Sequence, residues 1–170
     1  VDAETLVEKA YEAGQLDLGT ALLYQLQGMR DRTELPIAYR ESMPHAFCGT
    51  PHVVHAVSAL PHMDADYARR LGKLVQRRPS ADFSTVSPSG RFRVHYDTEG
   101  SERVDPTDSN ANGVPDYVDL TMAVLDSVWV LQIDQMGYSP PPEDGGVDGD
   151  EYDVYIVDLG RGGAYGFTYP

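Results

Sequence analysis

Residues 108–119 read D-S-N-A-N-G-V-P-D-Y-V-D, a spacing of oxygen-bearing groups that suits a calcium ion. Calcium takes about six to eight oxygen ligands, and an EF-hand-type loop supplies them from positions 1, 3, 5, 7, 9 and 12, with glycine at position 6 for the sharp turn. Gly113 stands at position 6, and the predicted ligands are Asp108, Asn110, Asn112, the carbonyl of Val114, Asp116 and Asp119. Position 12 is Asp rather than Glu, so the loop closes with a shorter side chain. The alternative interpretation is an acidic, glycine-containing loop that is simply solvated.

The charge of the chain is concentrated around this loop. Residues 97–153 carry 15 of the 27 acidic side chains but one of the 13 basic ones, Arg103, whereas residues 1–96 carry 11 of each. Clustered carboxylates attract cations. They argue against a nucleic-acid partner, which needs a basic surface. We therefore expect calcium as a ligand and no nucleic acid, although part of the acidic excess can serve solubility alone.

Two smaller groups of residues could also bind metal. Asp148, Asp150 and Asp153 lie in a glycine-rich loop before an apolar strand, and their spacing allows a second calcium site or an unpaired acidic loop. Cys48 lies in F-C-G-T-P, where a thiolate can ligate zinc or where the cysteine is a small buried residue. Together with His45, His52 and His55 it could form a zinc site, but the spacings differ from the common structural-zinc patterns.

Several familiar signatures are missing from the sequence. It contains no H-E-x-x-H, G-x-S-x-G, Walker or dinucleotide-binding pattern, so we identify no catalytic residues. His95 has no evident partner in the sequence. A single cysteine excludes an internal disulfide, and no apolar stretch is long enough to span a membrane.

The N-terminal half has helical periodicity. Apolar residues recur at helical spacing over residues 3–11 and 18–29, which predicts a helical hairpin with Asp17 capping the second helix. Residues 35–62 contain four prolines and are expected to be extended connections with one short strand, Val53 to Val57. A further helix is expected from Asp64 to about Arg78, and residues 81–90 read as a linker.

The C-terminal half has a different pattern. Alternation over residues 91–96 predicts a half-buried strand before the calcium loop. The helix that follows, from about residue 116 to 136, has a wide apolar surface and is expected to be buried on much of its circumference. A second strand is expected over residues 153–159. The predicted fold class is α+β: a helical region at 1–80, then a strand–calcium loop–helix–strand unit within 91–170.

The order of motifs from Ser87 onward resembles a family of secreted bacterial metallopeptidases. The matching segments are S-P-S-G-R-F-R-V-H-Y (87–96), the calcium loop (108–119), M-G-Y-S-P-P-P-E-D (136–144), Y-D-V-Y-I-V-D-L-G (152–160) and Y-G-F-T (165–168). Residues 10–24, 35–40 and 48–51 are similar to the region that precedes the protease domain in such proteins. C-G-T-P (48–51) also resembles the cysteine switch of matrixin zymogens, although Phe47 and His52 replace the flanking Arg and Asp.

The resemblance implies a propeptide-like region at 1–80 and, at 91–170, the calcium-stabilised front of a zincin-type protease domain. Cys48 would be the latency ligand of a catalytic zinc. The zinc-binding H-E-x-x-H would lie beyond Pro170, so zinc would be present only with that further sequence, and this chain alone is expected to be inactive. The implied partners are the rest of the protease domain and protein or peptide substrates.

We therefore interpret the chain as the calcium-binding N-terminal portion of a secreted zinc metallopeptidase precursor. No leader opens the chain, so an extracellular location implies that a leader has been removed, and the high calcium level outside cells favours that location. The alternative is a non-enzymatic calcium-binding module for adhesion or assembly. A downstream H-E-x-x-H in the parent gene would separate the two hypotheses.

Overall fold

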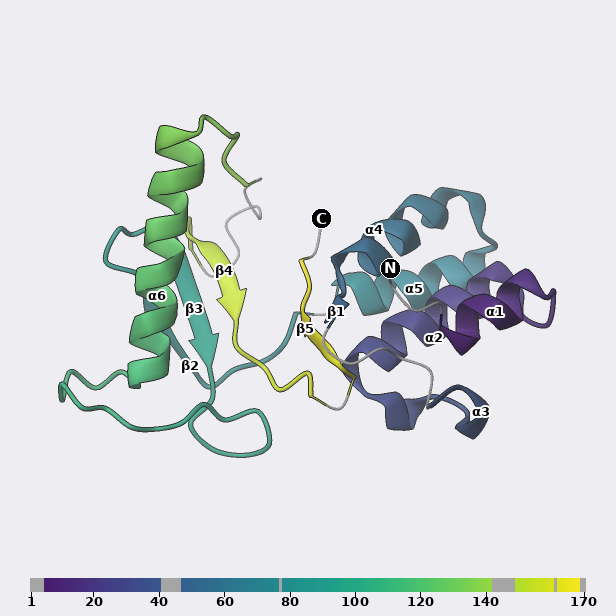
Figure 1. Ribbon diagram of the computed structural model, residues 1–170, viewed down its shortest axis with the longest axis horizontal. Coiled ribbons are helices and arrows are strands. Elements are labelled where there is room, and N and C mark those ends of the chain that lie inside the picture. Colours follow the sequence, from purple (N-terminus) through teal and green to yellow (C-terminus); the bar gives the residue numbers. More distant parts are fainter. Residues whose placement is uncertain (1–4, 41–46, 77, 142–148, 161, 169–170) are drawn as a thin grey trace. The chain divides into compact units, whose positions relative to one another are not determined.

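The computed structural model describes residues 5–40, 47–76, 78–141, 149–160 and 162–168 (Figure 1). The chain divides into two compact units, each of which is described by itself. The helical unit comprises Val1–Arg78 and Leu159–Pro170, and the sheet unit comprises Pro79–Asp158. No helix among the described residues has both the length and the apolar character needed to cross a membrane.

The first helices of the helical unit begin at side-chain caps. Helix α1 (Leu6–Glu12) begins with a capping box in which Thr5 and Glu8 each accept a hydrogen bond from the other's backbone N–H. Helix α2 (Leu18–Arg30) begins at Asp17, whose carboxylate accepts from the Thr20 N–H at 2.9 Å. These bonds satisfy N–H groups that a helix start leaves without partners. The predicted hairpin and the Asp17 cap are confirmed.

Further helical elements follow along the chain. They are η1 (Arg32–Glu34), α3 (Ile37–Arg40), α4 (Thr50–Ala59), η2 (Leu60–His62) and α5 (Ala65–Gln76). As predicted, Asp64 caps the last of these, accepting from the Tyr67 N–H at 3.1 Å. Helix α5 approaches α2 closely because position 19 is glycine: a Cβ there would lie 2.5 Å from the Tyr67 ring.

The predicted strand at Val53 to Val57 is wrong, because these residues lie within helix α4. Valine favours strands, but Pro51 lies in the first helical turn, where its missing N–H costs nothing. Val53 and Ala56, three residues apart, are buried on one side of the helix. Residues 35–62 are therefore largely helical rather than extended where the structure describes them.

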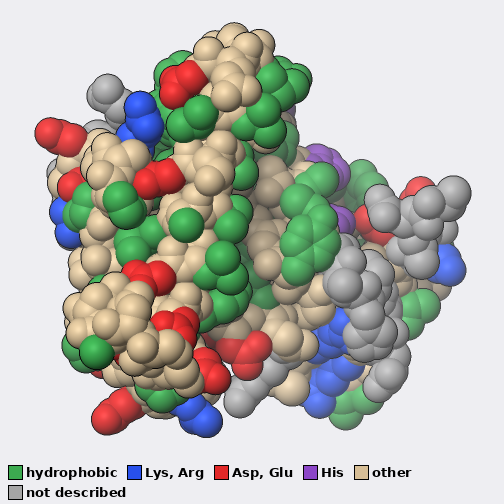
Figure 2. Space-filling view, turned by 60° about the vertical axis from the view of Figure 1, so that its left-hand side comes forward, with side chains coloured by type: hydrophobic (Ala, Val, Ile, Leu, Met, Phe, Trp, Pro, Cys, Tyr) green, Lys and Arg blue, Asp and Glu red, His purple; other side chains and the backbone are tan. Residues whose placement is uncertain are grey.

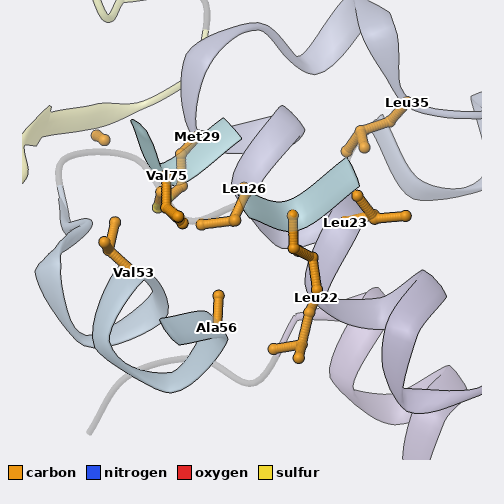
Figure 3. Close-up of a cluster of buried hydrophobic side chains, with 10 residues drawn as sticks. Leu22, Leu23, Leu26, Met29, Leu35, Val53, Ala56 and Val75 are labelled. Carbon is orange, nitrogen blue, oxygen red and sulfur yellow. The ribbon is translucent and has the colours of Figure 1, made fainter. Parts of the chain in front are cut away.

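One apolar core holds the helical unit together (Figure 3). In the close-up, Leu26, Met29 and Val75 lie near one another, and Val53 and Ala56 face them from α4. The buried members of the cluster are Leu22, Leu23, Leu26, Met29, Leu35, Val53, Ala56, Leu71, Val75 and Ala164. Ala164 comes from the far end of the sequence, so the core depends on a long-range contact.

The sheet unit contains three strands and one long helix. Strand β3 (Phe92–Tyr96) is central, with β2 (Phe83–Val86) antiparallel to it and β4 (Tyr152–Tyr155) parallel to it. In the sequence, helix α6 (Asp116–Trp129) lies between β3 and β4, and it continues as the π-helix η3 (Val130–Gln135). The buried residues between helix and sheet are Val94, Tyr96, Val104, Val118 and Met122. The α+β class is confirmed.

The boundaries of the units differ from those expected. Residues 81–90, predicted as a linker, include strand β2. Residues 159–170, expected to belong with 91–158, belong to the helical unit. There β5 (Ala164–Gly166) pairs in parallel with β1 (Phe47–Cys48). Gly162 makes this return feasible, since a Cβ at that position would lie 1.7 Å from the Met29 carbonyl oxygen.

Helix α6 is less buried than its composition indicates. Val118 and Met122 are buried against the sheet. On other sides of the helix, Leu120 is 60% exposed and Val124 is 52% exposed. The expectation of burial on much of the circumference is therefore wrong for the described part of the chain.

Candidate calcium-binding loop

The predicted calcium loop lies immediately before α6 and ends in its first turn. Asp116 and Asp119 are the acidic residues of that turn, where negative charge interacts favourably with the helix dipole. The Asp116 N–H donates to the Thr107 carbonyl at 2.8 Å, which ties the end of the loop to the residue before its start. The loop therefore positions its last two acidic residues through the helix itself.

Backbone hydrogen bonds close the loop around Asp108. Its two carboxylate oxygens accept from the N–H groups of Asn112 at 3.2 Å and Gly113 at 2.8 Å. Gly113 has φ +86°, a conformation that glycine adopts without steric cost, as the sequence predicts for position 6. Ala111 is also at positive φ, 56°, which is uncommon for a residue with a side chain.

Three predicted ligands converge on one point. The side-chain amides of Asn110 and Asn112 each donate to the same Asp119 oxygen at 2.9 Å. These are positions 3, 5 and 12 of the motif, which must face a common centre if they are to share an ion. The amide oxygens of Asn110 and Asn112 accept instead from the backbone N–H groups of Asn112 at 2.9 Å and Val114 at 2.8 Å, so ligation of calcium by these oxygens would require both amides to turn.

Asp116, at position 9, makes a different set of contacts. Its carboxylate accepts from the Ser109 N–H at 2.9 Å and from the Ser109 hydroxyl at 2.6 Å. In EF-hand loops this position often reaches calcium through a water molecule. The side chain of Asp116 therefore supports the loop in this structure and is not among the converging groups. The Val114 N–H donates to the Asn112 side-chain oxygen at 2.8 Å, and its carbonyl makes no hydrogen bond that the structure describes.

The donor set of the loop fits calcium better than a softer metal. In the described part of the chain, no three His, Cys, Asp or Glu side chains are close enough to hold an ion by themselves. The loop would need the amide oxygens of Asn110 and Asn112 and a backbone carbonyl, which are ligands for hard cations such as calcium. Its three carboxylates, Asp108, Asp116 and Asp119, have no ion-pair partner among the described residues.

The second predicted calcium group is only partly described. Asp148 lies outside the described residues, and Asp150 is exposed. Asp153 lies in strand β4, and its carboxylate is 2.8 Å from the His95 Nε2 on β3. Both side chains of this pair are at least nine-tenths buried, and Tyr155 stacks on the His95 ring at 4.3 Å between centroids. The structure therefore gives Asp153 a partner within the fold.

Sequence reasoning did not find the His95–Asp153 pair. In the parallel register of β3 and β4, Asp153 lies opposite Arg93, and Tyr155 lies opposite His95. His95 and Asp153 are therefore diagonal neighbours on two strands that are far apart in sequence. Alternation within each strand predicts which side chains share a face, but no local signal gives the pairing partner or its register. Only knowledge of the strand register could have identified this pair.

Cys48 is exposed at the end of β1, and Gly49 separates it from helix α4. Hydrogen bonds from the Thr50 hydroxyl and the Thr50 N–H lower the pKa of its thiol, with a smaller contribution from the Tyr165 hydroxyl. The exposure of Cys48 contradicts the alternative interpretation of a small buried residue. His45 lies outside the described residues, and the described histidines do not form a metal-binding group with Cys48.

No protein-family model, no curated protein and no solved structure matches the chain.

Proposed function

We propose that the Asp108–Asp119 loop binds one calcium ion and thereby stabilises the sheet unit. The observation that carries this proposal is the convergence of Asn110 and Asn112 on the Asp119 carboxylate, in a loop closed by Asp108. Three carboxylates without ion-pair partners lie within this short loop, and a bound divalent cation would reduce the repulsion among their charges. Because Asp119 lies in α6, the ion would link the loop to the helix that covers the sheet.

We propose further that the chain is the N-terminal portion of a secreted zinc metallopeptidase precursor, with Cys48 as its latency ligand. The ordered motifs from Ser87 onward support this proposal. The exposed thiol with its lowered pKa also supports it, because only a thiolate ligates zinc. The catalytic zinc itself would require the H-E-x-x-H motif, which this chain does not contain.

A second candidate is a non-enzymatic calcium-binding module that mediates adhesion or assembly. The exposed apolar side chains of α6 favour it, since exposed apolar patches commonly mark interaction sites. The presence of H-E-x-x-H downstream in the parent gene would support the peptidase precursor, and its absence would support the module.

The calcium proposal is tested by thermal unfolding of the chain in chelator and in increasing calcium. A ligand that binds only the native state stabilises it by about 2.7 kcal/mol at a hundredfold excess over Kd. We expect the melting temperature to rise with calcium, and Asp108→Asn and Asp119→Ala to lose most of that rise. Asp108→Asn retains a side-chain oxygen for the loop N–H groups while removing the charge.

Glu99→Ala is the matched control, because it removes an exposed carboxylate of the same unit outside the loop. This variant should keep the full calcium response. An equal response in Glu99→Ala and Asp108→Asn would indicate general charge screening. A melting temperature that does not change between chelator and calcium would reject the site.

A further inference from the structure

Both asparagines of the chain lie in the candidate calcium loop, and one of them, Asn112, is followed by glycine. An asparagine is deamidated when the backbone nitrogen of the next residue attacks its side-chain amide carbon, an intramolecular reaction that depends on close approach of the two groups. Glycine at the next position leaves that nitrogen unshielded. Asn112 and Gly113 are both exposed, and a Cβ at Gly113 would meet no atom within 4 Å. The attacking nitrogen and water therefore have open access to this amide.

The contacts of these two residues match the requirements of the reaction. The Gly113 N–H donates to an Asp108 carboxylate oxygen at 2.8 Å, so a proton acceptor lies within hydrogen-bond reach of the hydrogen that the attack removes. The Val114 N–H donates to the side-chain oxygen of Asn112 at 2.8 Å. Negative charge develops on that oxygen during the attack, and a donor aimed at it stabilises the charge. The loop thus supplies a base for the nucleophile and a donor for the developing oxyanion.

Asn110 provides a comparison within the same loop. Its side-chain oxygen also accepts from a backbone N–H, that of Asn112 at 2.9 Å, and its amide donates to Asp119 at the same distance as the amide of Asn112. The next residue is Ala111, whose Cβ crowds the backbone nitrogen and whose N–H donates no hydrogen bond that the structure describes. The two asparagines therefore have similar surroundings and differ in the nucleophile.

We propose that Asn112 is a self-modification site, at which the Gly113 nitrogen attacks the side-chain amide carbon when no ion is bound in the loop. The proton of the Gly113 N–H passes to the Asp108 carboxylate, a new C–N bond forms, and the bond from the amide carbon to Nδ2 breaks. The departing nitrogen takes up that proton and leaves as ammonia. Water then opens the cyclic imide at either carbonyl, which leaves an aspartyl or an isoaspartyl residue at position 112.

The consequence of this modification rests on the calcium site proposed above. The aspartyl product places a fourth carboxylate at position 5, where the motif accepts Asn or Asp, and more ligand charge strengthens calcium binding. Figure 2, in which the left-hand side of Figure 1 comes forward, shows more acidic than basic side chains on the face that comes forward. The added charge therefore increases a repulsion that a cation reduces. The isoaspartyl product instead lengthens the main chain before Gly113 and distorts the turn.

Bound calcium would oppose the reaction. Ligation occupies the Asp108 carboxylate, which then no longer accepts the Gly113 proton, and it requires the amide of Asn112 to turn away from the Val114 N–H. Deamidation would therefore accumulate in chains that spend time without calcium. The aspartyl fraction would then retain the ion at a lower calcium concentration than the unmodified chain.

The test incubates the full folded chain in chelator at neutral pH and follows both asparagines by peptide mass mapping with fragment-ion sequencing. Deamidation replaces NH2 by OH, and chromatography separates the aspartyl and isoaspartyl products. We expect Asn112 to react at least about tenfold faster than Asn110, because its nucleophile is unshielded and is paired with a base. Adding calcium should slow the reaction at Asn112.

Two variants with the same change of charge test the role of the fold. Asp108→Asn removes the proton acceptor and should slow deamidation of Asn112 in the folded chain by about tenfold. Asp105→Asn is the control, because the Asp105 carboxylate accepts from Thr107 rather than from Gly113. In denaturant both variants should react like the wild type. Circular dichroism checks that each variant is folded in buffer.

The calcium proposal and this one fail in different ways. If calcium leaves the melting temperature unchanged while Asn112 deamidates in chelator, the self-modification stands and its consequence for calcium is rejected. If Asn112 stays intact in chelator while calcium raises the melting temperature, the calcium site stands and the self-modification is rejected. Asn112→Asp reproduces the aspartyl product and should bind calcium more tightly than the wild type.

Three further results would overturn the proposal. Equal rates at Asn110 and Asn112 would remove the role of Gly113. An equal effect of Asp108→Asn and Asp105→Asn, or an effect of Asp108→Asn that persists in denaturant, would remove the role of the Asp108 contact. A rate at Asn112 that calcium does not change, although calcium raises the melting temperature, would show that the ion does not control the reaction.

Discussion

The thiol of Cys48 is surrounded by hydrogen-bond donors although it is exposed. The Thr50 hydroxyl and N–H groups lower its pKa, and Thr50 is itself held in place because its hydroxyl oxygen accepts from the Thr168 N–H at 3.1 Å. Since the folded pKa lies below its ordinary value, the thiolate fraction at neutral pH is larger than in the unfolded chain. The local structure therefore favours the reactive form of this residue.

This arrangement predicts the alkylation behaviour of Cys48. Iodoacetamide should label the folded chain with a pH midpoint below that of the chain in denaturant. Thr50→Val removes the hydroxyl donor and should move the midpoint of the folded chain upward. Thr121→Val, a control on α6, should leave it unchanged. The prediction fails if the folded and denatured chains share one midpoint.

The sequence predicts the conformation of the candidate loop where the contacts are local. The spacing of Asp108, Asn110, Asn112 and Asp119 indicates both the loop and the need for Gly113, because a few neighbouring residues determine its geometry. The engagement of Asp116 by Ser109 is not evident from spacing, since both side chains could reach other partners. The pairing of His95 with Asp153 depends on strand register, which no local pattern reveals.

At the scale of elements, the turn before β3 is attached to α6 by one carboxylate. Asp126 accepts hydrogen bonds from the Ser87 hydroxyl at 2.8 Å, the Ser89 N–H at 3.0 Å and the Ser89 hydroxyl at 2.5 Å. Burial by itself would raise the pKa of Asp126, but these hydrogen bonds and the nearby charge of Arg91 outweigh it and hold the pKa below its usual value.

Asp126→Asn should destabilise the chain by about 1 kcal/mol, because the amide keeps the shape but is a weaker acceptor. A lowered folded pKa contributes stability above the unfolded pKa, and this contribution is lost as the pH falls through the folded pKa. Urea unfolding should therefore show a gap between wild type and Asp126→Asn at neutral pH that narrows in acid. Asp134→Asn, on the exposed side of η3, is the control and should show little change at either pH. A gap that is constant with pH would contradict the assignment.

The elements were predictable where periodicity and caps agree. Helices α1, α2 and α5 and strand β3 follow from apolar spacing together with Asp17 and Asp64. Helix α4 was missed because Val53 and Val54 suggested a strand, although Val53, Ala56 and Val57 also have helical spacing. The exposure of α6 was missed because an apolar composition cannot distinguish a face buried within the chain from a face available to a partner.

At the scale of the whole molecule, the segment after the sheet unit belongs to the helical unit, although it is far from that unit in sequence. Strand β5 pairs with β1, and Ala164 is buried in the core of the helical unit at 5% exposure. No feature of the sequence around residues 159–168 indicates this partner, because it lies more than a hundred positions earlier. The sheet unit is thus an insertion within the helical unit.

A chain cut once between Ser80 and Ala81, through an inserted protease site, should remain a single particle in size-exclusion chromatography. The two fragments are expected to stay together through the β1–β5 pairing and the burial of Ala164. Gly162→Ala should separate them after cutting, since its Cβ would collide with the Met29 carbonyl oxygen. Gly166→Ala is the control in the same segment, because its Cβ would meet no atom within 4 Å. Immediate separation of the cut wild-type chain would contradict this prediction.

The return of residues 159–168 to the helical unit also affects how fast the two parts of a cleaved chain would separate. If residues 1–80 are removed during maturation, hydrolysis of one peptide bond does not release them, and the fragments separate only when β5 leaves β1. Release would then follow first-order kinetics with a lifetime set by that dissociation, and adding more of the processing protease would not shorten it. The delay between cutting and release would be a property of the substrate, encoded in a pairing only a few residues long.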